Sequence, residues 1–344
     1  MWERIDLLLE RAPHLRALRF HRVELLDLRR RRAAGLGVEA GLAADAALAA
    51  LNELAAPALL ARARAAWDGR LIVLKGPEVA LDYGGPGLRR FGDLDLLVDD
   101  PHGAQAALLR AGFGEVGERA RYRGIHHLRP LAWPGLPLTV EIHAHPKWPA
   151  GVPAPPLGAL LEAAVPSRLG ISGVEALPAA HHALLLAAHA WAHEPLSRLG
   201  DLIDVAVTSA RGDAGEPARL ARAWGCERLW RTTEAAVDAL LHGGRRSAAV
   251  AGWARHLRQT RERTVLEIHL QRCVAPLWGA PRRSAVAGFA AAVRGDARRD
   301  GTEAWGTKLA RSRVALANAG VARPEHDLAL RARGYITPER TGGR

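Results

Sequence analysis

Two short segments in which apolar and polar residues alternate lie in the middle of a chain whose two ends have the composition of helices. The first segment, 93–98, is Asp-Leu-Asp-Leu-Leu-Val, and the second, 138–143, is Leu-Thr-Val-Glu-Ile-His. Alternation with a period of two is typical of a β-strand that buries one face. A third apolar run, 71–74, ends at Gly76-Pro77, a pair that stops a strand. The pattern therefore predicts a small sheet within a largely helical chain.

The predicted fold class is α+β, a small mixed sheet with helices before and after it along the chain. Residues 1–68 are rich in Ala, Leu and Arg and are expected to form an N-terminal helical segment. Residues 69–150 are expected to form the sheet core, with a helix over 101–112 and a further strand over 126–133. We interpret 151–177 as a linker or rim, 178–322 as a C-terminal helical domain and 323–344 as a tail. Within the helical domain, helices are expected near 178–194, 196–210, 215–241, 245–274 and 302–319.

The composition favours a cytoplasmic protein that does not enter a membrane. The most apolar stretch, 41–61, is interrupted by Asp45, Asn52 and Glu53, so a membrane span is not expected. The first residues lack the basic and apolar pattern of a secretory signal. Cys226 and Cys273 are far apart in the sequence and have no metal-binding or redox spacing, which fits a reducing compartment.

The charge balance favours polyanionic partners in general. The chain carries 48 Lys and Arg against 36 Asp and Glu, a formal net charge of +12. Nearly all of the basic residues are arginine, and the lysines are Lys75, Lys147 and Lys308. Such usage is typical of a GC-rich genome, and we expect the arginines to be spread over every segment. Binding to nucleic acid should then be weak and non-specific.

The two alternating segments place three carboxylates where a cation is needed. Asp93 and Asp95 share one face of their strand because alternate residues point the same way. If 138–143 pairs beside that strand, Glu141 joins them on the same face. Carboxylates so close repel each other unless a cation lies between them, and hard oxygen ligands suit Mg²⁺ or Mn²⁺. The three residues are therefore candidate ligands of a two-metal site.

Candidate phosphate-binding residues precede the acids. Gly76 lies at a strand-to-helix turn, where its backbone can approach a phosphate and the helix N-terminus favours negative charge. Lys75 could reach the same phosphates, and Arg89 and Arg90 could hold them from the segment before the acidic strand.

At these residues the chain resembles the nucleotidyltransferase superfamily of the polymerase-β type, which carries a glycine turn, an Asp-x-Asp strand and a third acid on a later strand. It is most similar to a group of uncharacterised bacterial nucleotidyltransferase family proteins. That group has Leu-Lys-Gly, an Arg before Asp-x-Asp-Leu-Leu-Val, and Glu/Asp-x-His, which correspond here to 74–76, Arg89, 93–98 and 141–143. A helical stretch of the group resembles 182–205. The resemblance covers about residues 55–210.

The resemblance implies a metal-dependent nucleotidyltransferase that moves a nucleoside monophosphate from a triphosphate such as ATP to an acceptor, with release of pyrophosphate. Asp93, Asp95 and Glu141 would bind Mg²⁺ or Mn²⁺ and carry the catalysis. Lys75, Gly76 and Arg89 would bind the nucleotide phosphates. His143, His189 and Asp204 would stand beside these groups. The acceptor could be a small molecule, a protein side chain or an RNA end.

Two alternatives remain open at this point. The first is a catalytically silent module of the same fold that binds a nucleotide or a nucleic acid. The second is a zinc hydrolase, because His182, His189 and His193 share one helix face and Asp201 or Asp204 could complete a metal site.

Overall fold

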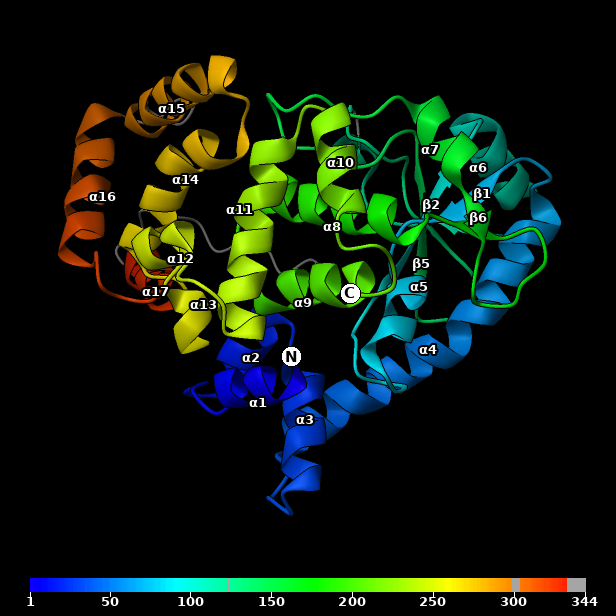
Figure 1. Cartoon of the computed structure of the whole chain (residues 1–344), viewed down its shortest axis with the longest axis horizontal. Coiled ribbons are helices and arrows are strands. Elements are labelled where there is room, and N and C mark those ends of the chain that lie inside the picture. Colours follow the sequence, from blue (N-terminus) through cyan, green and yellow to red (C-terminus); the bar gives the residue numbers. More distant parts are fainter. Residues whose placement is uncertain (123, 299–303, 333–344) are drawn as a thin grey trace.

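The computed structural model describes residues 1–122, 124–298 and 304–332, and it has a sheet on one side and a helical part on the other (Figure 1). The chain begins with helices α1 (Trp2–Leu9), α2 (Leu15–His21), α3 (Glu24–Ala33) and α4 (Ala40–Ala66). The sheet part follows, with β1 (Leu71–Val73), α5 (Pro77–Ala80), η1 (Leu81–Tyr83), β2 (Asp93–Val98), α6 (Pro101–Arg110), β3 (Gly114–Glu115), η2 (Arg119–Tyr122), β4 (Leu131–Ala132), β5 (Thr139–His143), α7 (Leu157–Ala163), β6 (Val165–Pro166) and β7 (Glu175–Ala176).

The rest of the described chain is helical. It comprises α8 (Ala179–His193), α9 (Leu199–Ser209), α10 (Glu216–Ala223), α11 (Glu227–Val237), the π-helical turn η3 (Asp238–His242), α12 (Ala248–Gly252), α13 (His256–Gln259), α14 (Val265–Gly279), α15 (Arg282–Ala297), α16 (Trp305–Ala317) and α17 (Arg323–Ala332). The α+β fold class predicted from the sequence is confirmed.

Strands β1 to β7 form one mixed sheet in the order β3-β4-β5-β2-β1-β7-β6. The central strand β2 is antiparallel to β1 and parallel to β5. The pairing of β5 with β2 meets the condition under which Glu141 joins Asp93 and Asp95 on one face of the sheet.

The alternation of side chains divides β2 between two layers. Leu94 and Leu96 are buried in a core that includes Leu59 and Leu60 of α4 and Leu108 of α6. On the opposite face, where the two aspartates also point, Leu97 joins Leu160 of α7 and Leu185 of α8 in a smaller core. The acids are therefore on the α7–α8 side of the sheet, next to a closely packed apolar region.

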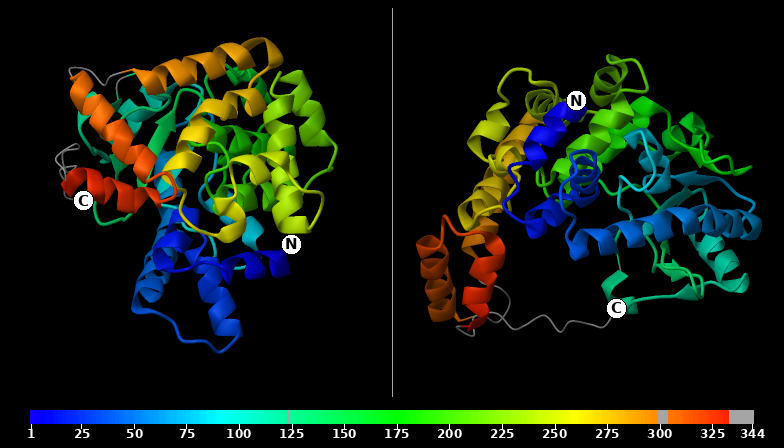
Figure 2. Two further views of the ribbon diagram at one scale, coloured as in Figure 1. Left: turned by 90° about the vertical axis from the view of Figure 1, so that its left-hand side faces the viewer. Right: turned by 90° about the horizontal axis from the view of Figure 1, so that it is seen from below.

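The N-terminal helices share one core with helices that follow the sheet. Ile5, Leu8 and Leu26 of the N-terminal helices are buried with residues of α8, α9 and α11, among them Leu184 and Leu229. Figure 1 shows α1 and α2 lying next to α9 and α13, which are far from them in sequence, while α3 projects away below them (two further views in Figure 2). The N-terminal helical segment therefore packs against α8, α9 and α11.

Several sequence expectations need correction. Residues 151–177 are more than a linker, because they contain α7 and the β6–β7 hairpin, and β7 pairs parallel to β1. The expected strand 126–133 is regular only in β4, and His127 adds one isolated bridge to His143. The expected tail 323–344 begins with α17, and its remainder, 333–344, lies outside the described residues, as do residues 302 and 303 of an expected helix.

Helix α4 has the length and apolar composition that could cross a membrane, and about a third of its most apolar window is buried. Its buried side packs on the sheet through Leu59, Leu60 and Ala63. Leu48, Leu51 and Leu54 are exposed on the other side. The helix thus serves as one outer layer of the sheet in this fold.

Candidate functional site

The register between β2 and β5 brings the predicted acids together. Asp95 stands directly opposite Glu141, and Asp93 stands opposite Thr139. Because these strands are parallel and paired in register, Asp95 and Glu141 project from the same face, and Asp93 lies two residues earlier on that face. Pairing between neighbouring strands is therefore what joins the two acidic motifs.

Asp95 is the most deeply buried of the three acids, with 1% of its surface exposed. Its Oδ2 lies 3.2 Å from Nζ of Lys75, and its Oδ1 lies 2.8 Å from Nε2 of His143. Burial alone would raise the pKa of Asp95, but the Lys75 ammonium and the His143 hydrogen bond hold it below its usual range. Asp95 is thus kept ionised inside the protein.

Asp93 and Glu141 are shifted in the opposite direction. Burial raises the pKa of Asp93, and the charge of Asp95 raises it further, against the effect of Lys75. Burial also raises the pKa of Glu141 to about 7, with a further contribution from Asp95 and Asp93. Asp93 and Glu141 therefore resist ionisation beside Asp95, and a cation bound among the three acids would relieve their repulsion.

The donor set fits a divalent metal. Asp95, Glu141 and His143 each offer a ligand atom, and these atoms all lie within 4.8 Å of one another. Two carboxylates and one imidazole are ligands that divalent metals accept in proteins. In the metal-free protein the ammonium of Lys75 supplies positive charge next to the carboxylate of Asp95.

Gly76 forms a turn that other residues would strain. Its φ is +68°, and an added Cβ would lie 3.2 Å from the carbonyl oxygen of Asp93. Gly76 precedes the short helix α5, so the turn brings the phosphate-binding candidates Lys75 and Gly76 against the start of β2. Absence of a side chain is needed here for both backbone conformation and close packing.

Arg89 is held in an internal ion pair instead of pointing freely at a ligand. Its Nε and Nη2 each lie 2.7 Å from a carboxylate oxygen of Asp204, and its Nη1 donates to the carbonyl oxygen of Gly76 at 3.0 Å. Tyr83 donates its hydroxyl proton to the same carboxylate at 2.6 Å. Arg89 and Asp204 therefore tie α9 to the glycine turn. Arg90, the other arginine before the acidic strand, also has an acidic partner: its Nη1 lies 3.4 Å from Oε1 of Glu24.

The histidines of α8 do not gather into a metal group among the described residues. Nε2 of His182 lies 2.5 Å from the carbonyl oxygen of Leu74, and this ring is fully buried. His189 lies with Nε2 3.4 Å from Nζ of Lys75, whereas Nδ1 of His193 lies 2.8 Å from Nζ of Lys147. The zinc-hydrolase alternative gains no support from this geometry, and His189 instead covers the acidic site.

Sequence reasoning did not single out two residues that the fold brings to the site. His127 lies with Nε2 3.6 Å from Oε2 of Glu141, because its strand-like segment bridges to His143. Lys147 follows β5 and contacts His193. The rarity of lysine in this chain was a signal for Lys147, whereas nothing in the local sequence pointed to His127.

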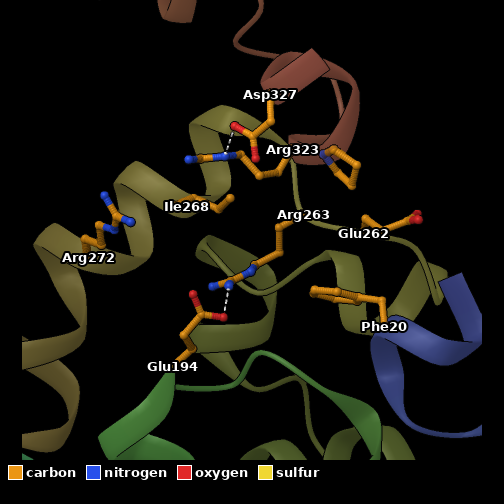
Figure 3. Close-up of a pocket in the computed structure, with 9 residues that line it drawn as sticks. Phe20, Glu194, Glu262, Arg263, Ile268, Arg272, Arg323 and Asp327 are labelled. Carbon is orange, nitrogen blue, oxygen red and sulfur yellow. Dashed lines mark hydrogen bonds and ion pairs between the residues drawn. The ribbon is translucent and has the colours of Figure 1, made fainter. Parts of the chain in front are cut away.

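A cavity of about 570 Å³ lies apart from the acids, between α2, α14 and α17 (Figure 3). Arg263 pairs there with Glu194, and Arg323 pairs with Asp327. None of the predicted site residues lines this cavity. The acidic face of β2 and β5, which holds the predicted residues, therefore remains the candidate site.

A mixed sheet with paired acids on two neighbouring strands, preceded by a glycine turn, defines a protein of the nucleotidyltransferase type. The chain belongs to the family described as "Uncharacterised nucleotidyltransferase", which matches residues 18–242. The resemblance stated from the sequence is thereby confirmed. No curated protein and no solved structure matches the chain.

Proposed function

We propose that the protein is a metal-dependent nucleotidyltransferase that transfers a nucleoside monophosphate from a nucleoside triphosphate to an acceptor and releases pyrophosphate. The observation that carries the proposal is the register of Asp95 against Glu141, with Asp93 on the same face. Membership of a nucleotidyltransferase family supports the nucleotide as substrate. We propose the bacterial cytoplasm as the place of the reaction, which the number and spacing of the cysteines favour.

Asp93, Asp95 and Glu141 would bind Mg²⁺ or Mn²⁺, with His143 beside them. When bound, the metal supplies Lewis-acid stabilisation of the phosphoryl oxygens and lowers the pKa of the attacking group. The carboxylate of Asp95 is held in place by its contacts with His143 and Lys75. Glu141, whose pKa burial raises to about 7 in the metal-free protein, would share the metal with the two aspartates and so help to activate the acceptor.

Lys75 would bind the triphosphate together with the backbone at Gly76. In the free protein its ammonium neutralises Asp95 at 3.2 Å. A cation bound by the acids would compete for that carboxylate, which would leave Lys75 available to a phosphate. Arg89 would act on this turn indirectly, by holding the carbonyl oxygen of Gly76.

The test is whether α-labelled and γ-labelled triphosphates behave differently. The protein is incubated with each of the four ribonucleoside triphosphates, Mg²⁺ or Mn²⁺, and a cell lysate as the source of acceptor. We expect the α-phosphate label to enter an acceptor and pyrophosphate to appear, while the γ-phosphate label leaves with pyrophosphate.

The variant Asp93→Asn/Asp95→Asn should abolish this labelling. The matched control is Asp99→Asn, which removes an exposed acid just after the same strand. Binding of the triphosphate without any labelling, equal in all three proteins, would favour the catalytically silent module over the enzyme.

A further inference from the structure

The net positive charge of the chain is confined to its C-terminal part, contrary to the even spread expected from the sequence. Residues 243–344 contain 20 of the 48 Lys and Arg but only 8 of the 36 Asp and Glu, an excess that equals the +12 of the whole chain. Residues 1–242 are balanced, and the family match ends at 242. The net charge therefore lies beyond the part of the chain that the family model matches.

Part of this charge lines a groove that runs along α11. Three adjoining hollows of about 540, 330 and 190 Å³ share residues: the first two have Arg228 and Arg231 in common, and the last two have Arg246 and Ser247 in common. Their lining includes one acid, Glu227. It includes eight arginines: Arg4, Arg11, Arg222, Arg228, Arg231, Arg246, Arg258 and Arg282.

These eight arginines, which we call the groove arginines, form no ion pair with any residue that the structure describes. All are exposed except Arg228, which is half-buried. Arg11 and Arg228 donate only to backbone carbonyl oxygens, those of Arg258 and Leu277. Elsewhere in the chain arginines such as Arg30 and Arg168 are matched by acids. So many unmatched guanidinium groups along one groove leave a strong positive field there.

We propose that this groove binds single-stranded nucleic acid through its phosphate backbone. Guanidinium groups bind phosphates through paired hydrogen bonds, and successive arginines along a groove match the repeated charge of a phosphodiester chain. Trp278 lies in the wall beside Arg228 and Thr232, where an aromatic ring can stack on an unpaired base. An acidic peptide would satisfy the arginines but would make no such use of the tryptophan.

One loop connects the elements of the acidic site to the groove, which is formed by other elements. The loop after β5 contains Lys147, which contacts His193 on α8. The same loop then reaches the groove, since Pro153 lies against Gly225 and Ser284 donates to the carbonyl oxygen of Gly151 at 3.3 Å. Five of the groove arginines lie outside the family match, so the binding surface is a feature of this chain. The proposal does not depend on the transfer reaction.

The experiment measures the binding of a fluorescent single-stranded RNA of about 20 nucleotides by anisotropy, over a series of salt concentrations. In the variant Arg231→Gln/Arg246→Gln/Arg282→Gln, which changes only exposed side chains, we expect affinity to fall about tenfold or more near physiological salt. The slope of log affinity against log salt should decrease in magnitude by about 2.

The control variant Arg32→Gln/Arg110→Gln/Arg119→Gln removes the same charge from α3, α6 and η2, and its affinity should stay near that of the wild type. Melting temperatures check that both variants are folded. An equal loss of RNA affinity in the two variants would overturn the proposal, because arginines anywhere on the surface would then contribute equally to binding. So would displacement of the RNA by polyglutamate or inorganic polyphosphate as effectively as by unlabelled RNA, or equal affinity for duplex RNA.

Discussion

Asp95 and Glu141 stand opposite each other in the sheet, yet their pKa values move in opposite directions. Asp95 has two partners that stabilise its charge, the ammonium of Lys75 and the imidazole of His143. No lysine or arginine among the described residues lies as close to Glu141, and burial beside the charged Asp95 raises its pKa to about 7. The difference arises from unequal access to positive charge, so binding of a cation should change Glu141 most.

The first prediction follows from this shift. The usual pKa of Glu141 is 4.5, so between pH 4.5 and about 7 the folded protein keeps a proton that the unfolded chain has lost. Stability must therefore fall as pH rises through this window, and Glu141→Gln should remove that fall. In EDTA the variant should gain about 1–3 kcal/mol over the wild type between pH about 5 and about 8.

Chemical denaturation at several pH values measures this difference. Saturating Mn²⁺ should stabilise the ionised carboxylate of the wild type and reduce the gap. A constant difference between the two proteins across the whole pH range would show that folding does not shift the pKa of Glu141, against the prediction.

The second prediction concerns Asp93, whose pKa is raised by burial and by Asp95. Replacing it with Asn keeps the shape but removes a ligand charge, so the rate of transfer should fall roughly 100- to 1000-fold, about 3–4 kcal/mol. The metal-free variant should be at least as stable as the wild type, because repulsion from Asp95 is relieved. Rate and melting temperature, measured on the same preparation, must move in these different directions; a parallel loss of both would indicate damage to the fold.

At the scale of elements, one ion pair connects the glycine turn to the helical part. Arg89 binds Asp204 of α9 through two hydrogen bonds and also holds the carbonyl oxygen of Gly76. Only 11–12% of these two charged side chains is exposed. Removing one partner leaves the other charge buried without compensation, which is costly. The ion pair thus positions the turn that is proposed to receive phosphate.

The third prediction is that Asp204→Asn lowers the free energy of unfolding by about 3–5 kcal/mol, because Arg89 then remains charged and buried. The double variant Arg89→Met/Asp204→Leu should lose markedly less, since it removes both charges. Urea denaturation of the two variants compares these values. If Asp204→Asn alone were no less stable than the double variant, Arg89 would have another partner or be free to contact ligand.

Local alternation was sufficient to predict β2 and β5, a short apolar run predicted β1, and the spacing of Asp93, Asp95 and Glu141 indicated a shared face. The sequence could not reveal β7, because two residues, Glu175 and Ala176, give no periodic pattern. Nor could it show that Arg89 is held by Asp204, a partner 115 residues away. Contacts of that kind depend on how helices pack on the sheet, which local patterns do not specify.

At the scale of the whole molecule, the two helical ends and the sheet support one another. The N-terminal helices pack into the core of α8, α9 and α11, and α8 in turn covers the acidic face with His189. The site therefore lies between the sheet and the helical part. Because Lys75, Asp95 and His189 come from both parts, a ligand bound there should stabilise the folded protein as a whole.

The last prediction tests that coupling. A ligand that binds only the folded protein raises its melting temperature, so a triphosphate should stabilise the wild type more in Mg²⁺ or Mn²⁺ than in EDTA. Much of that metal-dependent increment should disappear in Asp93→Asn/Asp95→Asn, since the acids that would hold the metal are gone, while Asp99→Asn should behave like the wild type. Thermal unfolding with and without metal measures the increment in all three proteins. Equal increments in the three would mean that these carboxylates do not form the metal site, and the family fold would then be binding triphosphate through Lys75 and the glycine turn alone.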